Sequence, residues 1–449
     1  MTSLLRVIFV AWALVHGASS AHAQLSFASA IDMALRNDPK IKAAQASVLK
    51  AQAAAAATRD AFIPTFVAHG GYGKSIGVPL SVPEVFSLSS QSLLFNFSQK
   101  DNQRAARAGL LAANFALEDA RGQVTEDVAL NYLDLSNAQQ RRAAIIQESG
   151  FASRLVSIVQ DRLSAGQDTQ IELLQARRTA AQIHLQELQV EDEIGTFSNH
   201  LARVMGLASD ALTTVPESVP PPLPIAQTAV LAEDSPAIRA AFANARAKQE
   251  LAFGDKRYRF RPQISFGATY SRISTSQTNY LDYYPGFNQK SQSAASIGLQ
   301  FAIPLYDRGQ EDRARESMAE ASRARFEAED QRNQFLDGRY RLQHNANQIE
   351  ARIELAHIER DIAQQQLEVV LVQISAEGGT STGPQMTPKD EQNARLQERA
   401  RTIDLLNFEL QLNHARIRFM RQNGQLEDWL KAAGRDTSAS PTSSVLRPQ

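Results

Sequence analysis

The stretch from Gln99 to Leu163 contains no proline, and this constrains the chain more than any other feature. Alanine, glutamine, arginine and glutamate dominate the interior of the sequence, and all four are strong helix formers. At about 1.5 Å per residue, one helix over this range would be about 98 Å long. Helices of globular proteins average about 11 residues, so the stretch predicts a rod rather than part of a compact core.

Apolar residues inside this stretch follow the spacing of a coiled coil. Leu110, Ala113, Leu117, Ala120 and Val124 are separated by alternating steps of three and four residues. Such a seam lets helices pack side by side, and its alanines permit close approach. The alternative, one amphipathic helix on a globular core, is disfavoured by the length.

The chain also carries a weak internal duplication. Three pairs of short segments match, and the offset between the members of a pair grows along the chain. The second half therefore carries two insertions, at the positions that correspond to residues 72–95 and 163–172 of the first half. Insertions concentrate in exposed loops, which predicts loop tips at these intervals. The matches are 38–44 with 235–241 (Pro39 and Pro236, 197 apart), 95–98 with 304–307 (Phe97 and Tyr306, 209 apart), and 175–177 with 393–395 (Ala176 and Ala394, 218 apart). The last offset also aligns Arg203 with Arg421 and Gly206 with Gly424.

The duplication and the proline signals predict the domain organisation. Each half should contain a helix, a strand hairpin and two long antiparallel helices; the first helix should run from Ser26 or Ser29 to about Arg59, before Pro64. The proline-rich stretch between the halves predicts an extended linker. The expected segments are a signal peptide 1–23; a first repeat 24–215 with hairpin 61–97 and helices 99–163 and 170–205; a linker 216–229; a second repeat 230–431 with hairpin 260–306 and helices 308–375 and 388–431; and a disordered tail 432–449.

The second-half strands alternate apolar with small or polar residues. This pattern is typical of a barrel strand between lipid and water, although a hairpin on a soluble core would show it too. A tyrosine-rich loop between the strands favours a membrane, because aromatic residues gather at membrane interfaces. Four strands cannot close a barrel, so several chains would have to share one. The apolar positions are Ile264, Phe266, Ala268 and Tyr270, then Ile297, Leu299, Phe301 and Ile303; the loop residues are Tyr280, Tyr283, Tyr284 and Phe287.

The N-terminus has the three parts of a secretory signal. Arg6 is followed by an apolar run over 7–15 and by Ala21-His22-Ala23, so cleavage is expected between Ala23 and Gln24. A membrane-anchoring helix is the less favoured alternative, because the run is short. The chain has no cysteine, which excludes disulfides, thiolate metal sites and a lipidated cysteine. No later apolar run reaches the roughly 18 residues of a spanning helix.

Charge and motifs exclude several functions. The formal net charge is -1, without the basic excess of a nucleic-acid-binding protein. The histidines have no metal-ligand spacing, and no catalytic motif is present. We therefore expect no enzyme activity, no catalytic residues, no metal and no cofactor.

The order of these elements resembles the TolC-like outer-membrane efflux proteins over roughly residues 26 to 431. The first-half junction before the long helix, 94–98, lacks the proline, aspartate and glycine of its second-half counterpart. The resemblance is carried by the duplication, by Phe62-Ile63-Pro64 and Phe260-Arg261-Pro262 before the hairpins, by the junction Ile303-Pro304-Leu305-Tyr306-Asp307-Arg308-Gly309, and by the turn 162–166 followed by Leu174-Gln175-Ala176-Arg177.

The resemblance implies a mainly α fold with a small β part. Long antiparallel coiled-coil hairpins would accompany four strands that contribute to a trimeric transmembrane β-barrel. It also implies a homotrimer in the outer-membrane lipid, extending into the periplasm, that works with a periplasmic adaptor (a membrane fusion protein) and an inner-membrane transporter. The expected function is an exit duct for efflux or type I secretion. A periplasmic coiled-coil adaptor and a structural or adhesin protein without a barrel are the alternatives.

The resemblance further implies candidate functional residues. The family narrows its tunnel near the periplasmic tip, where the matching acidic positions are Asp390 and Glu391, and Glu172 in the duplicate. Repeated around a pore, such carboxylates would favour cations; alternatively, they only complement the dipole of a helix that begins near Pro388. Two tips, 163–169 and 375–387, would contact the adaptor, or are ordinary turns. The tip candidates are Arg162, Leu163, Ser164, Gly166, Gly378 and Gly379.

Overall fold

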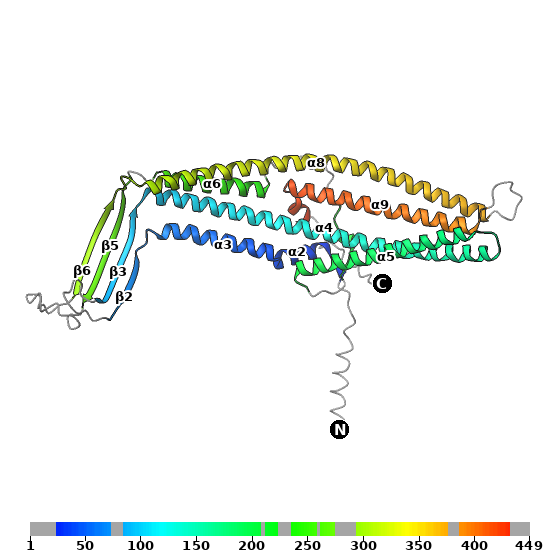
Figure 1. Cartoon of the computed structure of the whole chain (residues 1–449), viewed down its shortest axis with the longest axis horizontal. Helices are drawn as coiled ribbons and strands as arrows, with labels where there is room; N and C mark the ends of the chain where they lie inside the picture. Colours follow the sequence, from blue (N-terminus) through cyan, green and yellow to red (C-terminus); the bar gives the residue numbers. More distant parts are fainter. Residues whose placement is uncertain are drawn as a thin grey trace, which may run out of the picture. The chain divides into compact units, whose positions relative to one another are not determined.

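The computed structural model describes residues 24–72, 84–207, 212–222, 235–257, 261–273, 293–375 and 386–431 (Figure 1). Long helices dominate these residues, beside a small antiparallel sheet, so the predicted mainly helical fold class is confirmed. The elements are β1 (Gln24–Leu25), α2 (Phe27–Asn37), α3 (Pro39–Asp60), β2 (Thr65–Gly70), β3 (Glu84–Phe95), α4 (Phe97–Ser164), α5 (Gln170–Met205), β4 (Thr213–Thr214), η1 (Pro216–Ser218), α6 (Pro236–Lys256), β5 (Gln263–Ile273), β6 (Ser293–Ala302), α8 (Arg308–Ser375) and α9 (Pro388–Gln422).

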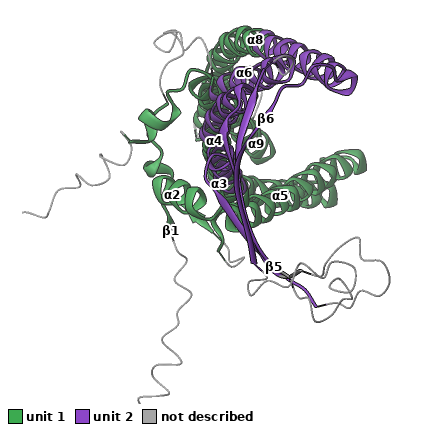
Figure 2. Ribbon diagram, turned by 90° about the vertical axis from the view of Figure 1, so that its left-hand side faces the viewer, with its two compact units in different colours: residues 1–42, 120–235, 335–449 green, residues 43–119, 236–334 purple. Residues whose placement is uncertain are grey.

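The chain forms two compact units, coloured separately in Figure 2. The first unit comprises residues 1–42, 120–235 and 335–449, and the second comprises residues 43–119 and 236–334. Each unit therefore combines segments from both halves of the sequence. The two predicted repeats stay a prediction, because these units cut across them.

The two longest helices, α4 and α8, have 68 residues each. The start of α8 follows from its sequence, since the carboxylate of Asp307 accepts a hydrogen bond from the backbone N–H of Gln310 at 3.1 Å. Charged and polar residues are frequent along both helices. Within the described ranges, no helix combines the length and the apolar character needed to cross a membrane.

Two helix boundaries differ from the sequence prediction. The single helix expected up to about Arg59 is divided into α2 and α3, because Pro39 lacks an N–H and the carboxylate of Asp38 accepts the N–H of Lys40 at 2.6 Å. The last long helix ends at Gln422 rather than at 431. Gly424 has a φ of 71°, which ends α9 before a short helical segment over 426–431.

The core of the first unit includes the seam between α4 and α5. Alternating apolar residues of the two helices are buried against each other, which is the packing expected of an antiparallel helical hairpin. Leu396 of α9 joins the same cluster. The buried members are Ala138, Ile145, Ala152, Leu155 and Val159 of α4, and Leu173, Ala176, Ile183 and Val190 of α5.

The second unit contains a four-stranded antiparallel sheet in the order β2-β3-β5-β6, whose strands lie side by side in Figure 1. Residues directly opposite each other on paired strands share one face of the sheet. The predicted apolar positions do so: Phe266 lies opposite Leu299, and Ala268 lies opposite Ile297. The other face carries small and polar residues such as Thr269 opposite Ser296.

Candidate functional site

The turn between α4 and α5 is the first of the two predicted tips. Gly166 has a φ of 73°, a left-handed conformation that favours glycine, and the N–H of Gln167 donates to the carbonyl of Arg162 at 2.8 Å. Ser164 Oγ donates to the carbonyl of Asp161 at 2.7 Å. Leu163 packs against the α4–α5 core. The turn is therefore a closely bonded structure rather than a loose connection.

An ion-pair network joins this turn to the start of α9. The nearly buried carboxylate of Asp168 lies 3.2 Å from Arg162 Nε and 3.5 Å from Lys389 Nζ. Lys389 Nζ also donates to Glu172 Oε1 at 2.7 Å. Two cations and two carboxylates thus meet within the first unit, and their formal charges cancel.

The protonation of this network follows from its geometry. The hydrogen bond from Lys389, together with those from the Thr169 backbone and hydroxyl, lowers the pKa of Glu172 from 4.5 to about 2. The same contact with Glu172 raises the pKa of Lys389. Glu172 and Lys389 are therefore a charged pair throughout the physiological pH range.

The acidic candidates lie in the first turns of two helices. Glu172 and Thr169 form a capping box at the start of α5. Asp390 occupies the third position of α9, as Glu172 does in α5. Its carboxylate accepts hydrogen bonds from the backbone N–H of Thr387 at 2.8 Å and from the hydroxyl of Thr387 at 2.7 Å. Glu391 pairs with Arg395, at 2.8 Å between Oε1 and Nη2. Each of the three predicted constriction residues thus has a partner within its own chain.

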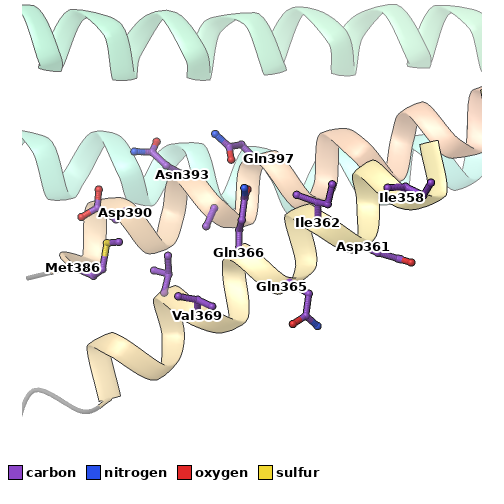
Figure 3. Close-up of a pocket in the computed structure, with 12 residues that line it drawn as sticks. Ile358, Asp361, Ile362, Gln365, Gln366, Val369, Met386, Asp390, Asn393 and Gln397 are labelled. Atoms are coloured by element: carbon purple, nitrogen blue, oxygen red, sulfur yellow. The ribbon is translucent and has the colours of Figure 1, made fainter. Parts of the chain in front are cut away.

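A groove between α8 and α9 lies beside Asp390 (Figure 3). Its volume is about 770 Å³. The α8 wall mixes aliphatic residues such as Ile362 and Val369 with Gln365 and Gln366, and the α9 wall carries Asn393 and Gln397. Two acidic residues, Asp361 and Asp390, line the groove, and no basic residue does. The groove therefore combines aliphatic surface with negative charge.

Some predicted positions cannot be placed. Gly378 and Gly379 of the second tip and Ala23 of the cleavage site lie outside the described residues. Gln24 is within them and forms β1, where it pairs with Thr213.

The sequence prediction missed Asp168 and Lys389. Thr169 and Glu172 have the spacing of a capping box, so the start of α5 was accessible from the sequence. Nothing in the sequence shows that Lys389, 217 positions from Glu172, lies beside it.

Among the described residues, no group of three or more histidine, aspartate or glutamate side chains could hold a metal ion.

Comparison with solved structures places this fold among outer-membrane channels. The chain is similar to VceC of Vibrio cholerae, at 19% identity over 89% of this chain and 96% of that chain, with a TM-score of 0.70. It is similar to CmeC of Campylobacter jejuni, at 16% identity over 92% of this chain and 89% of that chain, with a TM-score of 0.71. The open state of MtrE of Neisseria gonorrhoeae gives 13% identity over 89% of each chain and a TM-score of 0.67. At these identities the likeness establishes the fold.

The family comparison agrees with the fold. Residues 30–207 match the model of the family described as outer membrane efflux protein. No curated protein sequence matches the chain closely enough to count as a relative. The predicted resemblance to the TolC-like outer-membrane efflux proteins is confirmed, and the outer-membrane location predicted with it agrees with the matched family.

Proposed function

We propose that this chain is one subunit of a trimeric exit duct, with a shared β-barrel in the outer membrane and a helical tunnel that extends into the periplasm. The observation that carries the proposal is the sheet of the second unit, whose large apolar side chains lie mostly on one face and are exposed in the single chain. Ile297 is 79% exposed and Phe66 is 71% exposed. Large apolar side chains at such exposure need a lipid or protein neighbour.

The register of the sheet supports a barrel wall. Leu88 of β3 lies opposite Ala68 of β2 and Tyr270 of β5, so the apolar face continues from the first-half strands to the second-half strands. The opposite face, with Ser87 opposite His69 and Ser271, is polar and suits a water-filled interior. The sheet ends in β2 and β6. Pairing these edges between copies would close the sheet and remove its unpaired backbone groups.

The partners follow from the family rather than from a contact in this chain. In the proposed assembly, the ends of α4 and α8 and the starts of α5 and α9 meet a periplasmic adaptor, which connects the duct to an inner-membrane transporter. The turn with Arg162, Leu163, Ser164 and Gly166 and the second tip with Gly378 and Gly379 are the proposed contacts. The transporter supplies the energy, so the duct performs no catalysis. A cargo exported by efflux or type I secretion would pass through it.

Asp390, Glu391 and Glu172 are the proposed acidic residues of the constriction. Glu172 and Glu391 are paired with Lys389 and Arg395, whereas Asp390 caps the start of α9. Asp390 lines the groove between α8 and α9, which leaves one side of its carboxylate accessible. Repeated in three subunits, the Asp390 carboxylates would make the local potential negative and favour cations, with a smaller net contribution from the two paired residues.

Adjacent residues of β6 provide the test of the barrel. Leu299 belongs to the apolar face and Gln300 to the polar face. Leu299→Arg should lower the amount of protein assembled in the outer membrane, because an arginine facing lipid costs about 2–4 kcal/mol at the bilayer midplane. The matched control Gln300→Arg should assemble normally.

Assembly is measured by membrane fractionation and by heat-modifiable migration on gels. Equal assembly of Leu299→Arg and the wild-type protein would contradict the barrel. A periplasmic protein without a barrel, the alternative function, predicts that result.

A further inference from the structure

Two aromatic rings lie at the end of the apolar sheet face, where strand β3 passes into helix α4. A register shift between Leu93 and Phe95 places Phe95, the last residue of β3, opposite Ile264 of β5. Ile264 in turn lies opposite Phe301 of β6, which is 66% exposed. The ring of Phe97, the first residue of α4, meets the ring of Phe95 edge to face, with 4.7 Å between the ring centroids. The apolar face therefore ends in an aromatic pair.

Each ring of this pair carries a cation. Lys100 Nζ lies 5.0 Å from the centroid of the Phe95 ring, and the guanidinium carbon of Arg261 lies 4.6 Å from the centroid of the Phe97 ring. The negative face of an aromatic ring attracts a cation at such a distance. The two cations come from different segments, since Lys100 belongs to the first turns of α4 and Arg261 to the connection between α6 and β5. They therefore flank one aromatic pair from two directions.

The described part of the chain does not neutralise these two cations. Within it, neither Lys100 nor Arg261 has a carboxylate within ion-pair distance. The neighbouring carboxylate of Asp101 is nearly buried; it bonds Arg104 at 3.1 Å and lies 3.8 Å from Arg257. A guanidinium that lies over a ring keeps the N–H groups at its edge free to donate. Lys100 and Arg261 therefore offer unused donors and positive charge beside an apolar surface.

The surroundings of the aromatic pair suit lipid. Strands β3 and β5 are the central strands of the sheet, so pairing of the edge strands β2 and β6 between copies would leave this part of the face open. Aromatic and basic residues gather at membrane interfaces, where hydrocarbon gives way to phosphate. A ligand with both acyl chains and an anionic group matches the apolar face and the two cations. Further exposed apolar residues lie at the same end of the sheet, before β2 and after β6: Ile63, Ile303, Leu305 and Tyr306.

We infer that Lys100 and Arg261 bind the phosphodiester of an anionic phospholipid, whose acyl chains lie along the apolar sheet face beside Phe95 and Phe97. The guanidinium can donate to two phosphate oxygens at once, and the ammonium adds a second positive charge. This inference rests on the proposed duct, in which this end of the sheet lies at the membrane leaflet that faces the periplasm. It assigns a lipid-binding role to the junction between strand and helix.

Native mass spectrometry of the full chain in detergent, titrated with phosphatidylglycerol, tests the site. The wild-type protein should retain phosphatidylglycerol more strongly than phosphatidylcholine, whose headgroup has no net charge. Lys100→Gln and Arg261→Gln should each weaken the binding of phosphatidylglycerol about fivefold, which is the contribution of one basic residue near an anionic membrane surface. Arg315→Gln is the matched control, because Arg315 is an exposed basic residue near the start of α8 that pairs with Asp312 at 3.3 Å. It should leave lipid binding unchanged.

A conservative variant separates the lost charge from any damage to the fold. Arg261→Lys keeps a positive charge over the Phe97 ring, so it should keep most of the phosphatidylglycerol binding that Arg261→Gln loses. Both variants should show the heat-modifiable migration of the wild-type protein on gels. Equal loss of lipid binding in Arg261→Lys and Arg261→Gln would contradict a role of this charge in binding the headgroup.

Other outcomes overturn the inference. Equal retention of phosphatidylglycerol by the wild-type protein and by the double variant Lys100→Gln with Arg261→Gln would exclude the site. Inorganic phosphate that displaces the bound lipid would identify a site for free phosphate, and would exclude the contribution of the acyl chains. Failure of the proposed duct is detected separately, as absence of channel conductance in a bilayer. A conducting channel that binds no phosphatidylglycerol would leave the duct standing and remove the lipid site alone.

Discussion

Lys389 Nζ lies 2.7 Å from Glu172 Oε1, which ties the first turn of α9 to the first turn of α5. The two residues are 217 positions apart, so the contact joins the two halves of the sequence at one end of the first unit. The same lysine reaches Asp168 in the α4–α5 turn. In the proposed duct, this link would hold the tip of the second long hairpin against the tip of the first.

The Glu172–Lys389 pair should make stability depend on pH in a defined direction. The folded pKa of Glu172, about 2, lies below its ordinary value of 4.5, so the stabilisation is complete above about pH 5 and is lost as the pH falls toward 2. Glu172→Gln keeps a side chain that can form a capping box, and it should lower the thermal midpoint at pH 7 but not near pH 2. Thermal unfolding in detergent at several pH values measures this. A midpoint difference that persists near pH 2 would exclude the ion pair as its cause.

Asp390→Asn separates the charge of this residue from its capping role. Asparagine keeps an oxygen for Thr387, so α9 should keep its start, while one negative charge per subunit is lost. If Asp390 belongs to the constriction, the variant should lower the preference for cations over anions in bilayer recordings. The neutral variant Asn393→Ala, on the same wall of the groove, is the control. Unchanged cation selectivity in Asp390→Asn would remove this residue from the constriction.

Tyr132→Phe should destabilise the first unit. The hydroxyl of the fully buried Tyr132 donates to the carbonyl of Leu25 at 2.6 Å and accepts from the N–H of Val215 at 2.9 Å, and burial raises its pKa. Removing the hydroxyl leaves the carbonyl of Leu25 and the N–H of Val215 without this partner. The free energy of unfolding should therefore fall by about 1–3 kcal/mol. Trp429 packs on Phe27 in the same cluster, so its fluorescence can follow chemical unfolding. Tyr340→Phe, at an exposed position, should leave the stability unchanged. An equal loss of stability in both variants would contradict the role assigned to the Tyr132 hydroxyl.

Two glycines with the same backbone conformation should differ in their tolerance of alanine. Gly206 and Gly424 both have a left-handed φ, of 73° and 71°. Backbone strain should therefore lower the free energy of unfolding of each alanine variant by about 1 kcal/mol. A Cβ at Gly206 would also lie 3.3 Å from Cβ of Asn37, whereas one at Gly424 would meet nothing within 4 Å. Gly206→Ala should therefore unfold at the lower denaturant concentration. The reverse order would contradict the close approach of Asn37.

Local signals explain what the sequence could predict. The start of α5 follows from the capping box of Thr169 and Glu172. Its end follows from Gly206, which adopts a left-handed backbone conformation that few residues other than glycine adopt. The apolar face of β5 and β6 follows from strict alternation, because no register shift interrupts their pairing. Asp307 marks the start of α8 for the same local reason.

Other features needed three-dimensional information. Ser90 and Ser92 lie opposite Ala268 and Phe266 on the apolar face, and register shifts occur near both ends of β3, so this face is hidden in the sequence. The division at Asp38 was missed because alanine-rich sequence surrounds Pro39, which suits the first turn of a new helix. The partners of Glu172 and Tyr132 lie far away in the sequence, and spacing alone carries no information about them.

Single-channel recording of the purified full-length chain in a planar lipid bilayer tests the proposed duct most directly. The exposed apolar face of the sheet and its two unpaired edges predict insertion as an oligomer and discrete, reproducible conductance steps. Leu299→Arg should reduce the number of insertions, and Gln300→Arg should leave it unchanged. A protein that stays in solution without detergent and adds no conductance to the bilayer would contradict the duct.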